Sequence, residues 1–128
     1  MTAFPLTSLG TILIVAFTFY ASFGAGKLRG QVKAPAVSGD FEFEKAFRVH
    51  YNTIEQLVLF MPVLWLSAPY WGDQASGAAA GVWLVGRIIY ARAYRKDPST
   101  RSMGFLITLM ATFAAFVASC IPLVMMLF

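Results

Sequence analysis

Residues 102–128 read SMGFLITLMATFAAFVASCIPLVMMLF, a run of 27 residues without a charged side chain. A second run, PLTSLGTILIVAFTFYASFGAG at residues 5–26, is uncharged over 22 residues. A helix that crosses the apolar core of a bilayer needs about 20 mostly apolar residues. Both stretches therefore predict helices that span a membrane.

Two shorter uncharged runs lie between them, at residues 56–72 and 74–86. Each reaches spanning length only when ionisable residues at one end are included. Breakers separate the runs: a polar loop at residues 30–40, the pair Gly72-Asp73, and Asp97-Pro98-Ser99. We therefore predict an all-α, integral membrane four-helix bundle formed by a single domain, residues 1–128. The predicted helices cover about residues 5–27, 43–71, 75–96 and 100–127.

The composition of the chain also points to lipid. Of its 128 residues, 59% are hydrophobic and only 12% are charged, whereas about a quarter of a soluble domain is charged. A chain this small buries too little of its surface to hide so much apolar area from water. These values exclude a soluble globular enzyme and a disordered tail. With one cysteine, Cys120, an internal disulfide is excluded too.

The net charge of +4 is explained by membrane topology rather than by nucleic acid. All ten basic residues lie in or near the loops at residues 30–40 and 97–99, and the termini and the 72–74 turn have none. The positive-inside rule then places these two loops in the cytoplasm and both termini outside. The predicted location is a bacterial inner membrane or an endoplasmic-reticulum-like membrane.

Polar side chains gather at the predicted cytoplasmic ends of the helices. Two sets each share one helix face: Arg48, Asn52 and Glu55, and then Arg87, Tyr90 and Tyr94. Arg101 and Ser102 follow at the start of the last helix. Because charges inside spans are costly, they are by default a functional hypothesis. We expect these side chains to converge on one pocket at the inner membrane interface.

The chemistry of this pocket suggests its ligand. Three arginines offer bidentate donors for carboxylates, and one glutamate offers an acceptor for an ammonium group. The matching ligand is small and net anionic, with more carboxylates than amines, and glutathione fits this description. Alternatively, Arg48, Glu55 and Arg87 could pair with each other, and the tyrosines could be interfacial belt residues. His50, the only histidine, has no metal-ligand partners and is expected at the pocket rim, with no metal bound.

The same residues resemble a known family. The segment FRVHYNTIE at residues 47–55 and the segment GRIIYARAY at residues 86–94, followed by Arg101-Ser102, are similar to the two signatures of the MAPEG family, membrane-associated proteins in eicosanoid and glutathione metabolism. The resemblance covers the whole chain. The patterns R-x3-N-x2-E and R-x2-Y-x3-Y-x6-R are specific only in combination.

The resemblance implies a homotrimer with glutathione as co-substrate, bound between neighbouring subunits at the cytoplasmic side. Arg101 matches an arginine that stabilises the thiolate, Ser102 matches a serine of the prostaglandin synthase branch, and Arg29 matches a family arginine near the end of the first helix. Phe105 replaces a tyrosine of that branch, so prostaglandin synthesis is not expected. The residues implied to bind glutathione are Arg29, Arg48, His50, Asn52, Glu55, Arg87, Tyr90, Tyr94 and Ser102.

The predicted function is that of a membrane-bound glutathione transferase, with a role in detoxification and with peroxidase activity as a further possibility. Its second substrate would be a lipophilic electrophile that enters from the bilayer. Two other classes stay open. A small proton-coupled multidrug exporter needs a proton carrier deep in a span, but Glu55 is the only acid within one and it sits beside arginines. A non-catalytic membrane scaffold needs only apolar faces and the weak GxxxG motif of Gly77 and Gly81.

Overall fold

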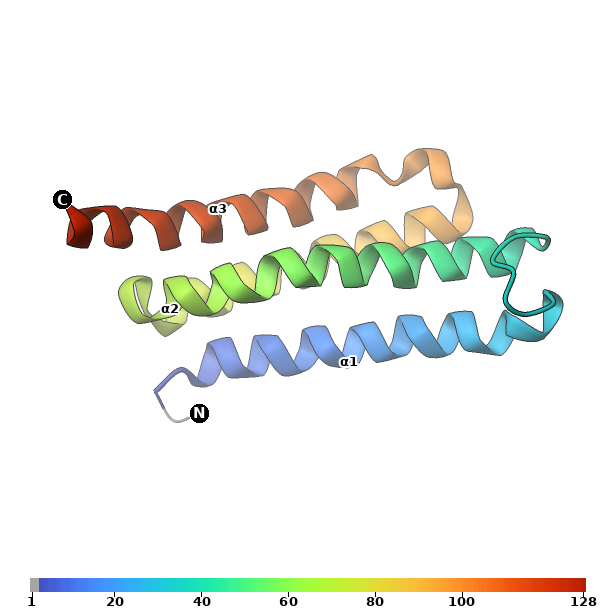
Figure 1. The fold of residues 1–128 in the computed structure, drawn as a ribbon, viewed down its shortest axis with the longest axis horizontal. Helices are drawn as coiled ribbons and strands as arrows, with labels where there is room; N and C mark the ends of the chain where they lie inside the picture. The colour runs from blue at the N-terminus through green and yellow to red at the C-terminus, as the bar shows by residue number, and fades with distance from the viewer. Residues whose placement is uncertain (1–2) are drawn as a thin grey trace.

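The computed structural model describes residues 3–128, and this part of the chain is almost entirely helical, without a β-strand. The all-α prediction is therefore confirmed. The elements in chain order are α1 (Pro5–Leu28), the short 3-10 helix η1 (Arg29–Gln31), α2 (Phe41–Lys96), the short 3-10 helix η2 (Pro98–Thr100) and α3 (Ser102–Leu127). Figure 1 shows the long helical segments lying side by side.

The helix α2 folds back on itself at Gly72. The backbone there is not helical, with φ 84° and ψ 165°, a conformation that glycine adopts without the steric cost that a Cβ adds. We call residues 41–71 the first arm and residues 73–96 the second arm (Figure 1). The rings of Phe60 and Trp83 stack across the arms with their centroids 5.3 Å apart. Among residues 3–128 the structure thus has three α-helices where four were predicted, because the chain reverses so tightly at Gly72 that the second and third predicted helices form the single element α2.

Two helical segments of the described chain are long and apolar enough to cross a membrane, Pro5–Gln31 and Pro98–Leu127. Most of their apolar side chains face outward, including Phe23, Met110 and Phe113, which are each more than 60% exposed. Water-soluble monomers rarely expose apolar surface on this scale. The exposed faces of α1 and α3 are therefore suited to contact with lipid.

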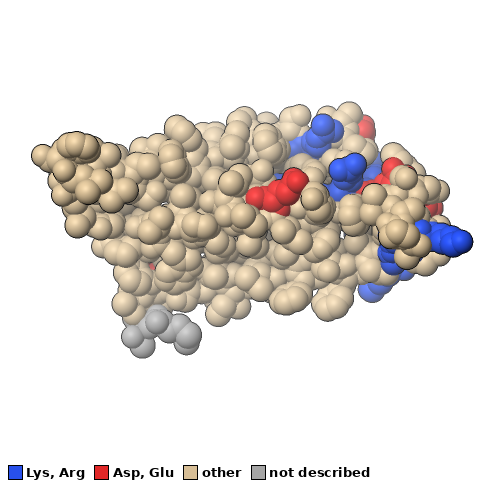
Figure 2. All heavy atoms as spheres, in the orientation of Figure 1, with Lys and Arg blue, Asp and Glu red and all other residues tan. Residues whose placement is uncertain are grey.

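The charged side chains are concentrated at one end of the molecule. Figure 2 shows most lysines and arginines at the end formed by the 30–40 loop and η2. The start of α1, the end of α3 and the Gly72 turn lie at the opposite end (Figure 1). Among residues 3–128 the fold thus separates a basic end from an end without lysine or arginine, the pattern that the positive-inside rule describes. The side of the membrane on which each end lies stays a prediction.

The glycine motif on the second arm packs against α1 within the monomer. A Cβ on Gly77 would lie 2.7 Å from the Cβ of Leu6, whereas one on Gly81 would meet no atom within 4 Å. On α1, a Cβ on Gly10 would lie 2.5 Å from the Cβ of Ala80. Small residues allow this close approach of two helices. Of the two glycines of the motif, only Gly77 is used in that contact.

A tryptophan compensates for the proline inside α3. Pro122 has no backbone N–H, so the carbonyl of Ala118, four residues earlier, loses its usual helical donor. The indole Nε1 of Trp71 donates a hydrogen bond to this carbonyl at 2.6 Å. This bond also joins the end of the first arm to α3. In lipid, where no water can replace a missing donor, such a bond is worth more than at a wet surface.

The N-terminus of α1 is capped by a side chain from the Gly72 turn. The two carboxylate oxygens of Asp73 accept hydrogen bonds from the backbone N–H groups of Leu6 and Thr7, each at 2.8 Å, and Oδ1 also accepts one from the Thr7 hydroxyl. The first N–H groups of a helix otherwise have no acceptor. Asp73 therefore fixes α1 to the turn between the arms.

The Asp73 cap makes stability depend on pH. Desolvation raises the pKa of the Asp73 carboxyl, but the hydrogen bonds from Thr7 and Leu6 together outweigh it and leave the pKa below its ordinary value of 3.8. A depressed pKa stabilises the folded state above the unfolded value, and this contribution is lost as the pH falls through the folded pKa. We expect the thermal midpoint in detergent to fall more on acidification below pH 3.8 in the wild type than in Asp73→Asn. Equal losses in the two proteins would contradict this role.

Candidate functional site

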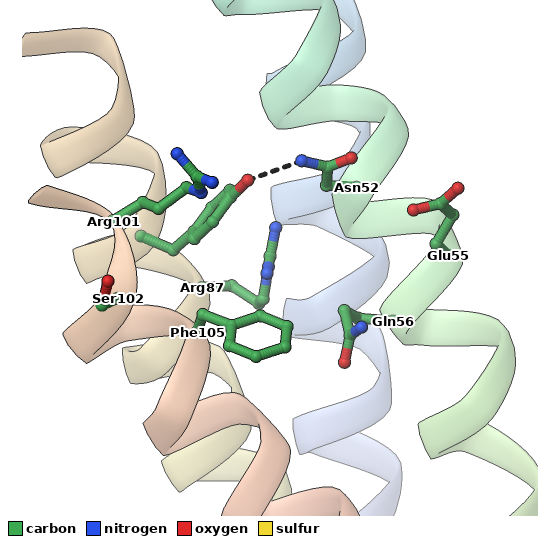
Figure 3. Close-up of a pocket in the computed structure, with 8 residues that line it drawn as sticks. Asn52, Glu55, Gln56, Arg87, Arg101, Ser102 and Phe105 are labelled. Carbon is green, nitrogen blue, oxygen red and sulfur yellow. Dashed lines mark hydrogen bonds between the residues drawn. The ribbon is translucent and has the colours of Figure 1, made fainter. Parts of the chain in front are cut away.

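A pocket of about 430 Å³ lies at the junction of the two arms of α2 with the start of α3. Figure 3 shows side chains of the first arm facing those of α3, with Arg87 of the second arm between them. Six of the residues predicted from the sequence line this pocket together. The complete lining is Asn52, Glu55, Gln56, Arg87, Tyr90, Arg101, Ser102 and Phe105.

Arg87 is the buried charge of the pocket. Its side chain is 0% exposed, its Nη2 donates a hydrogen bond to the Thr53 hydroxyl at 3.0 Å, and its guanidinium lies 4.0 Å from the centroid of the Tyr90 ring. Its Nε and Nη1 have no hydrogen-bond partner among residues 3–128. Burying a charge without full hydrogen bonding is expensive. The pocket therefore holds donors that a negatively charged group could satisfy.

Tyr90 and Asn52 join the two arms beside Arg87. The Asn52 side-chain amide donates a hydrogen bond to the Tyr90 hydroxyl oxygen at 2.6 Å (Figure 3). Tyr90 is almost fully buried, and its ring packs on that of Tyr94 with the centroids 5.5 Å apart. Because the hydroxyl oxygen accepts from Asn52, its own proton can be donated to another group in the pocket.

Arg101 stands on the short turn that precedes α3. Its Nη1 donates a hydrogen bond to the carbonyl of Pro98 at 2.9 Å, and its guanidinium lies 5.8 Å from the Tyr94 ring centroid. The turn is stabilised by Asp97, whose Oδ1 accepts hydrogen bonds from the backbone N–H and the hydroxyl of Ser99. These bonds hold the pKa of Asp97 below its usual range. The Arg101 side chain is thus exposed but anchored at the mouth of the pocket.

Two glycines bring α3 close enough to the second arm to form the pocket. A Cβ on Gly104 would lie 2.6 Å from the Cα of Tyr90 and 2.7 Å from the carbonyl oxygen of Gly86. A Cβ on Gly86 would lie 2.7 Å from the hydroxyl of Thr108. Real Cβ atoms are not found this close to other atoms, so both positions need glycine. Their contact sets the distance between Arg87 on α2 and Arg101 on α3.

The pocket carries a net positive charge. Two arginines and one glutamate line it, whereas three arginines were predicted. Arg48, Glu55 and Arg87 do not neutralise one another as the alternative supposed. Among residues 3–128 the one salt bridge joins Lys45 to Glu42 at 2.7 Å. The positive charge of the site is therefore left uncompensated by the acids of this chain.

Four predicted residues do not line the pocket. Arg48 is exposed one turn before Asn52. His50 is half-buried, and its Nδ1 has no partner in the described part of the chain. The ring of Tyr94 contacts that of Tyr90 at an interplanar angle of 36°. Arg29 is occupied in the loop, where its Nη1 donates to the carbonyl of Ala36 and its guanidinium lies 5.1 Å from the Phe43 ring centroid.

Two lining residues were not predicted as site residues, Gln56 and Phe105. Each follows a predicted residue by four positions, Gln56 after Asn52 and Phe105 after Arg101. Residues at i and i+4 share one face of a helix. Helical spacing counted from Asn52 and from Arg101 could therefore have found both. The Gln56 Oε1 is buried without a partner among residues 3–128.

The fold and site together define a helical membrane protein with a positively charged pocket between its helices, in which one arginine is buried. Residues 7–121 match the model of the MAPEG family. The chain belongs to the MAPEG family, as the resemblance of its two signatures predicted.

Comparison with individual proteins agrees with this assignment. The chain is 38% identical over 100 residues to an uncharacterized protein of Synechocystis sp., covering 78% of this chain and 72% of that protein. It is 31% identical over 91 residues to human microsomal glutathione S-transferase 2, covering 71% of this chain and 62% of the human protein. It is 27% identical to leukotriene C4 synthase of Cavia porcellus over 97 residues, 73% of this chain and 65% of the synthase. The chain thus spans less than two thirds of the length of these two enzymes.

Proposed function

We propose that the protein is a glutathione transferase that activates the thiol of glutathione for attack on electrophiles dissolved in the membrane. The observation that carries this proposal is Arg87: a fully buried guanidinium with two unpartnered nitrogen atoms, in a pocket with a second arginine and no paired acid among residues 3–128. A site of this kind is suited to a small ligand with more carboxylates than ammonium groups. The named transferase and synthase relatives support the same ligand.

The lining residues match the groups of glutathione. Arg87 offers free donors for a carboxylate, and guanidinium–carboxylate bonds are among the strongest hydrogen bonds in proteins. Glu55 offers an acceptor for the ammonium group. Asn52 and Tyr90 supply neutral hydrogen bonds, with Tyr90 already positioned by Asn52. In this proposal Arg87, Glu55, Asn52 and Tyr90 bind the peptide, and Arg101 faces its thiol.

The role of Arg101 is to favour the thiolate. A free thiol with a pKa of about 8.5 is only a few per cent ionised at neutral pH. A guanidinium at hydrogen-bond distance stabilises the anion and lowers this pKa. The thiol proton then leaves to solvent, the thiolate sulfur forms a bond to the electrophilic carbon, and the leaving group departs with its electron pair. With a hydroperoxide as acceptor, the sulfur would bond to the terminal oxygen while the O–O bond breaks and an alkoxide leaves and takes up a proton. A second glutathione thiol would then reduce the resulting sulfenic acid, giving the disulfide and water.

The open side of the pocket suits a substrate from the bilayer. Arg101, Ser102 and Phe105 are all exposed where α3 begins. The apolar outer face of α3 continues from this edge, with Leu109, Met110 and Phe113 exposed along it. A lipophilic electrophile concentrated in the membrane could reach Arg101 along this face without crossing water. This explains why such chemistry is placed in a membrane protein.

We also propose that the active form is a homotrimer in which a neighbouring subunit completes the site. Arg48 is exposed and His50 carries an unpartnered nitrogen, and neither lines the pocket of its own chain. In an assembly the exposed Arg48 could reach the pocket of the next subunit, whereas the Nδ1 of His50 is buried within its own chain. The mass of the detergent-solubilised protein, measured by light scattering with the detergent contribution subtracted, should equal three chains. A monomer that binds glutathione fully would contradict this proposal.

The Arg87→Met variant tests glutathione binding separately from the stability of the fold. Because an incompletely paired buried charge is costly, an apolar side chain of similar length should leave the thermal midpoint unchanged or raise it. Glutathione affinity, measured by calorimetry, should fall at least about tenfold, since a charged hydrogen bond is worth about 1.5–3 kcal/mol. Arg92→Met, at an exposed position on the same arm, is the matched control. Retained affinity in Arg87→Met would refute the proposed site.

The activity itself is tested by conjugation of glutathione to a generic aromatic halide in reconstituted vesicles. We expect wild-type turnover above the uncatalysed rate, with loss in Arg87→Met. If the protein binds glutathione but conjugates no electrophile, we would conclude that it is a glutathione-binding protein of the same fold and not a transferase. Absence of binding would favour the scaffold interpretation.

A further inference from the structure

A second cavity, lined by two cations and by apolar and aromatic side chains, lies between α1 and the end of the second arm, apart from the pocket described above. It has a volume of about 250 Å³ and shares no lining residue with that pocket. We call it the basic groove. Its lining is Tyr20, Phe23, Gly24, Lys27, Leu28 and Arg95.

The basic groove contains two cations and no acid. Lys27 is in the last turn of α1 and Arg95 is in the last turn of α2. Among residues 3–128 neither forms a salt bridge, since the ion pair of this chain joins Lys45 and Glu42. A small cavity with two uncompensated positive charges favours an anion and disfavours a cationic headgroup.

Arg95 is held at the groove by contacts on both sides. The buried Lys45 donates a hydrogen bond from Nζ to the backbone carbonyl of Arg95 at 2.8 Å. The Nη1 of Arg95 lies 3.9 Å from the position that a Cβ on Gly24 would take, so the guanidinium rests against the bare backbone of α1. The backbone of Arg95 is thus fixed, and this reduces the conformational entropy that Arg95 loses when an anion binds.

The rim of the groove is aromatic and apolar. Tyr20 is 66% exposed and Phe23 is 67% exposed on the outer face of α1, where Tyr20 is about two turns and Phe23 between one and two turns from the end of the helix. Aromatic side chains are typical of the membrane interface, where one part of a ligand is polar and the other apolar. A neighbouring cavity, which shares Tyr20, Gly24 and Arg95 with the groove, has a volume of only about 20 Å³ and is too small to hold an acyl chain. A ligand must therefore place its charge in the groove and its hydrocarbon along Tyr20 and Phe23.

We propose that the basic groove binds the phosphate group of an anionic phospholipid, with Lys27 and Arg95 as its two cationic ligands. The acyl chains of the lipid pack along the exposed face of α1. The basic end of the molecule, where Figure 2 shows most of the lysines and arginines, is also where lipid phosphates lie. Basic pockets between helices at this depth are the usual sites of anionic headgroups. This proposal is independent of the proposed glutathione site.

The test is lipid retention by the full chain. The protein is reconstituted in vesicles of phosphatidylcholine with phosphatidylglycerol, extracted in detergent, and its bound lipid is counted by native mass spectrometry. We expect retained phosphatidylglycerol to exceed phosphatidylcholine, and we expect its retention to fall about fivefold in Lys27→Gln and in Arg95→Gln. Arg95→Lys should keep most of the retention. Arg92→Gln, an exposed cation outside the groove, is the matched control and should not change it.

Three outcomes would overturn the proposal. Equal losses in Arg95→Gln and Arg92→Gln would show a diffuse charge effect rather than a site. Displacement of the lipid by millimolar inorganic phosphate at constant ionic strength would assign the groove to a soluble anion. A parallel loss of glutathione affinity in Lys27→Gln and Arg95→Gln would make the groove part of the thiol site. Unchanged glutathione affinity with lost lipid supports the proposal, whatever reaction the first pocket performs.

Discussion

Replacement of Arg101 by alanine should abolish thiolate formation while leaving glutathione bound. If the guanidinium lowers the thiol pKa by about two units, its removal raises the free energy of the thiolate by about 2.7 kcal/mol, or roughly a hundredfold in the ratio of thiolate to thiol. The pH profile of conjugation should move upward by the same two units or so. Affinity for glutathione should change only severalfold, because Arg87 supplies the buried donors.

The measurement is the ultraviolet absorbance of the thiolate on addition of glutathione, with conjugation measured in the same preparation. Arg101→Lys keeps the charge but not the planar fork and should restore part of the signal. Lys96→Gln removes a cation at the same end of the molecule without touching the pocket and should have no effect. An undiminished thiolate signal in Arg101→Ala would remove Arg101 from the mechanism.

The second large effect is expected at Gly104, where a single methyl group should separate α3 from the second arm. The added Cβ would lie 2.6 Å from the Cα of Tyr90 and 2.7 Å from the carbonyl of Gly86. Both neighbours are backbone atoms within a helix and cannot move as a side chain can. Overpacking of a well-packed contact costs about 1–3 kcal/mol, and we expect Gly104→Ala at the upper end or beyond.

Gly104→Ala should also lower glutathione affinity. When the start of α3 moves away from the second arm, the pocket residues Arg101, Ser102 and Phe105 move away with it. Thermal unfolding and calorimetric binding in detergent measure the two effects separately. Gly81→Ala is the matched control: a Cβ there meets nothing within 4 Å, and alanine in a helix is favoured over glycine by about 0.5–1 kcal/mol. Equal midpoints for Gly104→Ala and Gly81→Ala would contradict the close contact.

The membrane character and the helical class were predictable from the sequence because they depend on composition and on runs of uncharged residues. The site was predictable in part because i, i+3 and i+4 spacing places residues on one helix face. That reasoning found Asn52, Glu55, Arg87 and Tyr90. It could not tell that Arg48, on the same face as Asn52, stands one turn outside the pocket.

Other features depended on contacts between segments far apart in the chain. Nothing local to Asp73 indicates that it caps α1, 66 residues away. Nor does the sequence around Pro122 name Trp71 as the donor for the carbonyl that the proline leaves free. Each such pairing depends on how far one helix is shifted along its axis relative to the other, and this shift is determined by all the contacts between the two helices.

What the amino-acid sequence determined by itself was where apolar helices run, where charges stand along them, and which family motifs they carry, since each of these is a property of neighbouring residues. Only the tertiary structure decided that Arg87 is buried with two nitrogen atoms that have no hydrogen-bond partner among residues 3–128. It also decided that Gly104 lets α3 touch Tyr90 and that Lys27 and Arg95 line the same groove. Burial and the distance between helices arise from three-dimensional packing, and no local pattern encodes them.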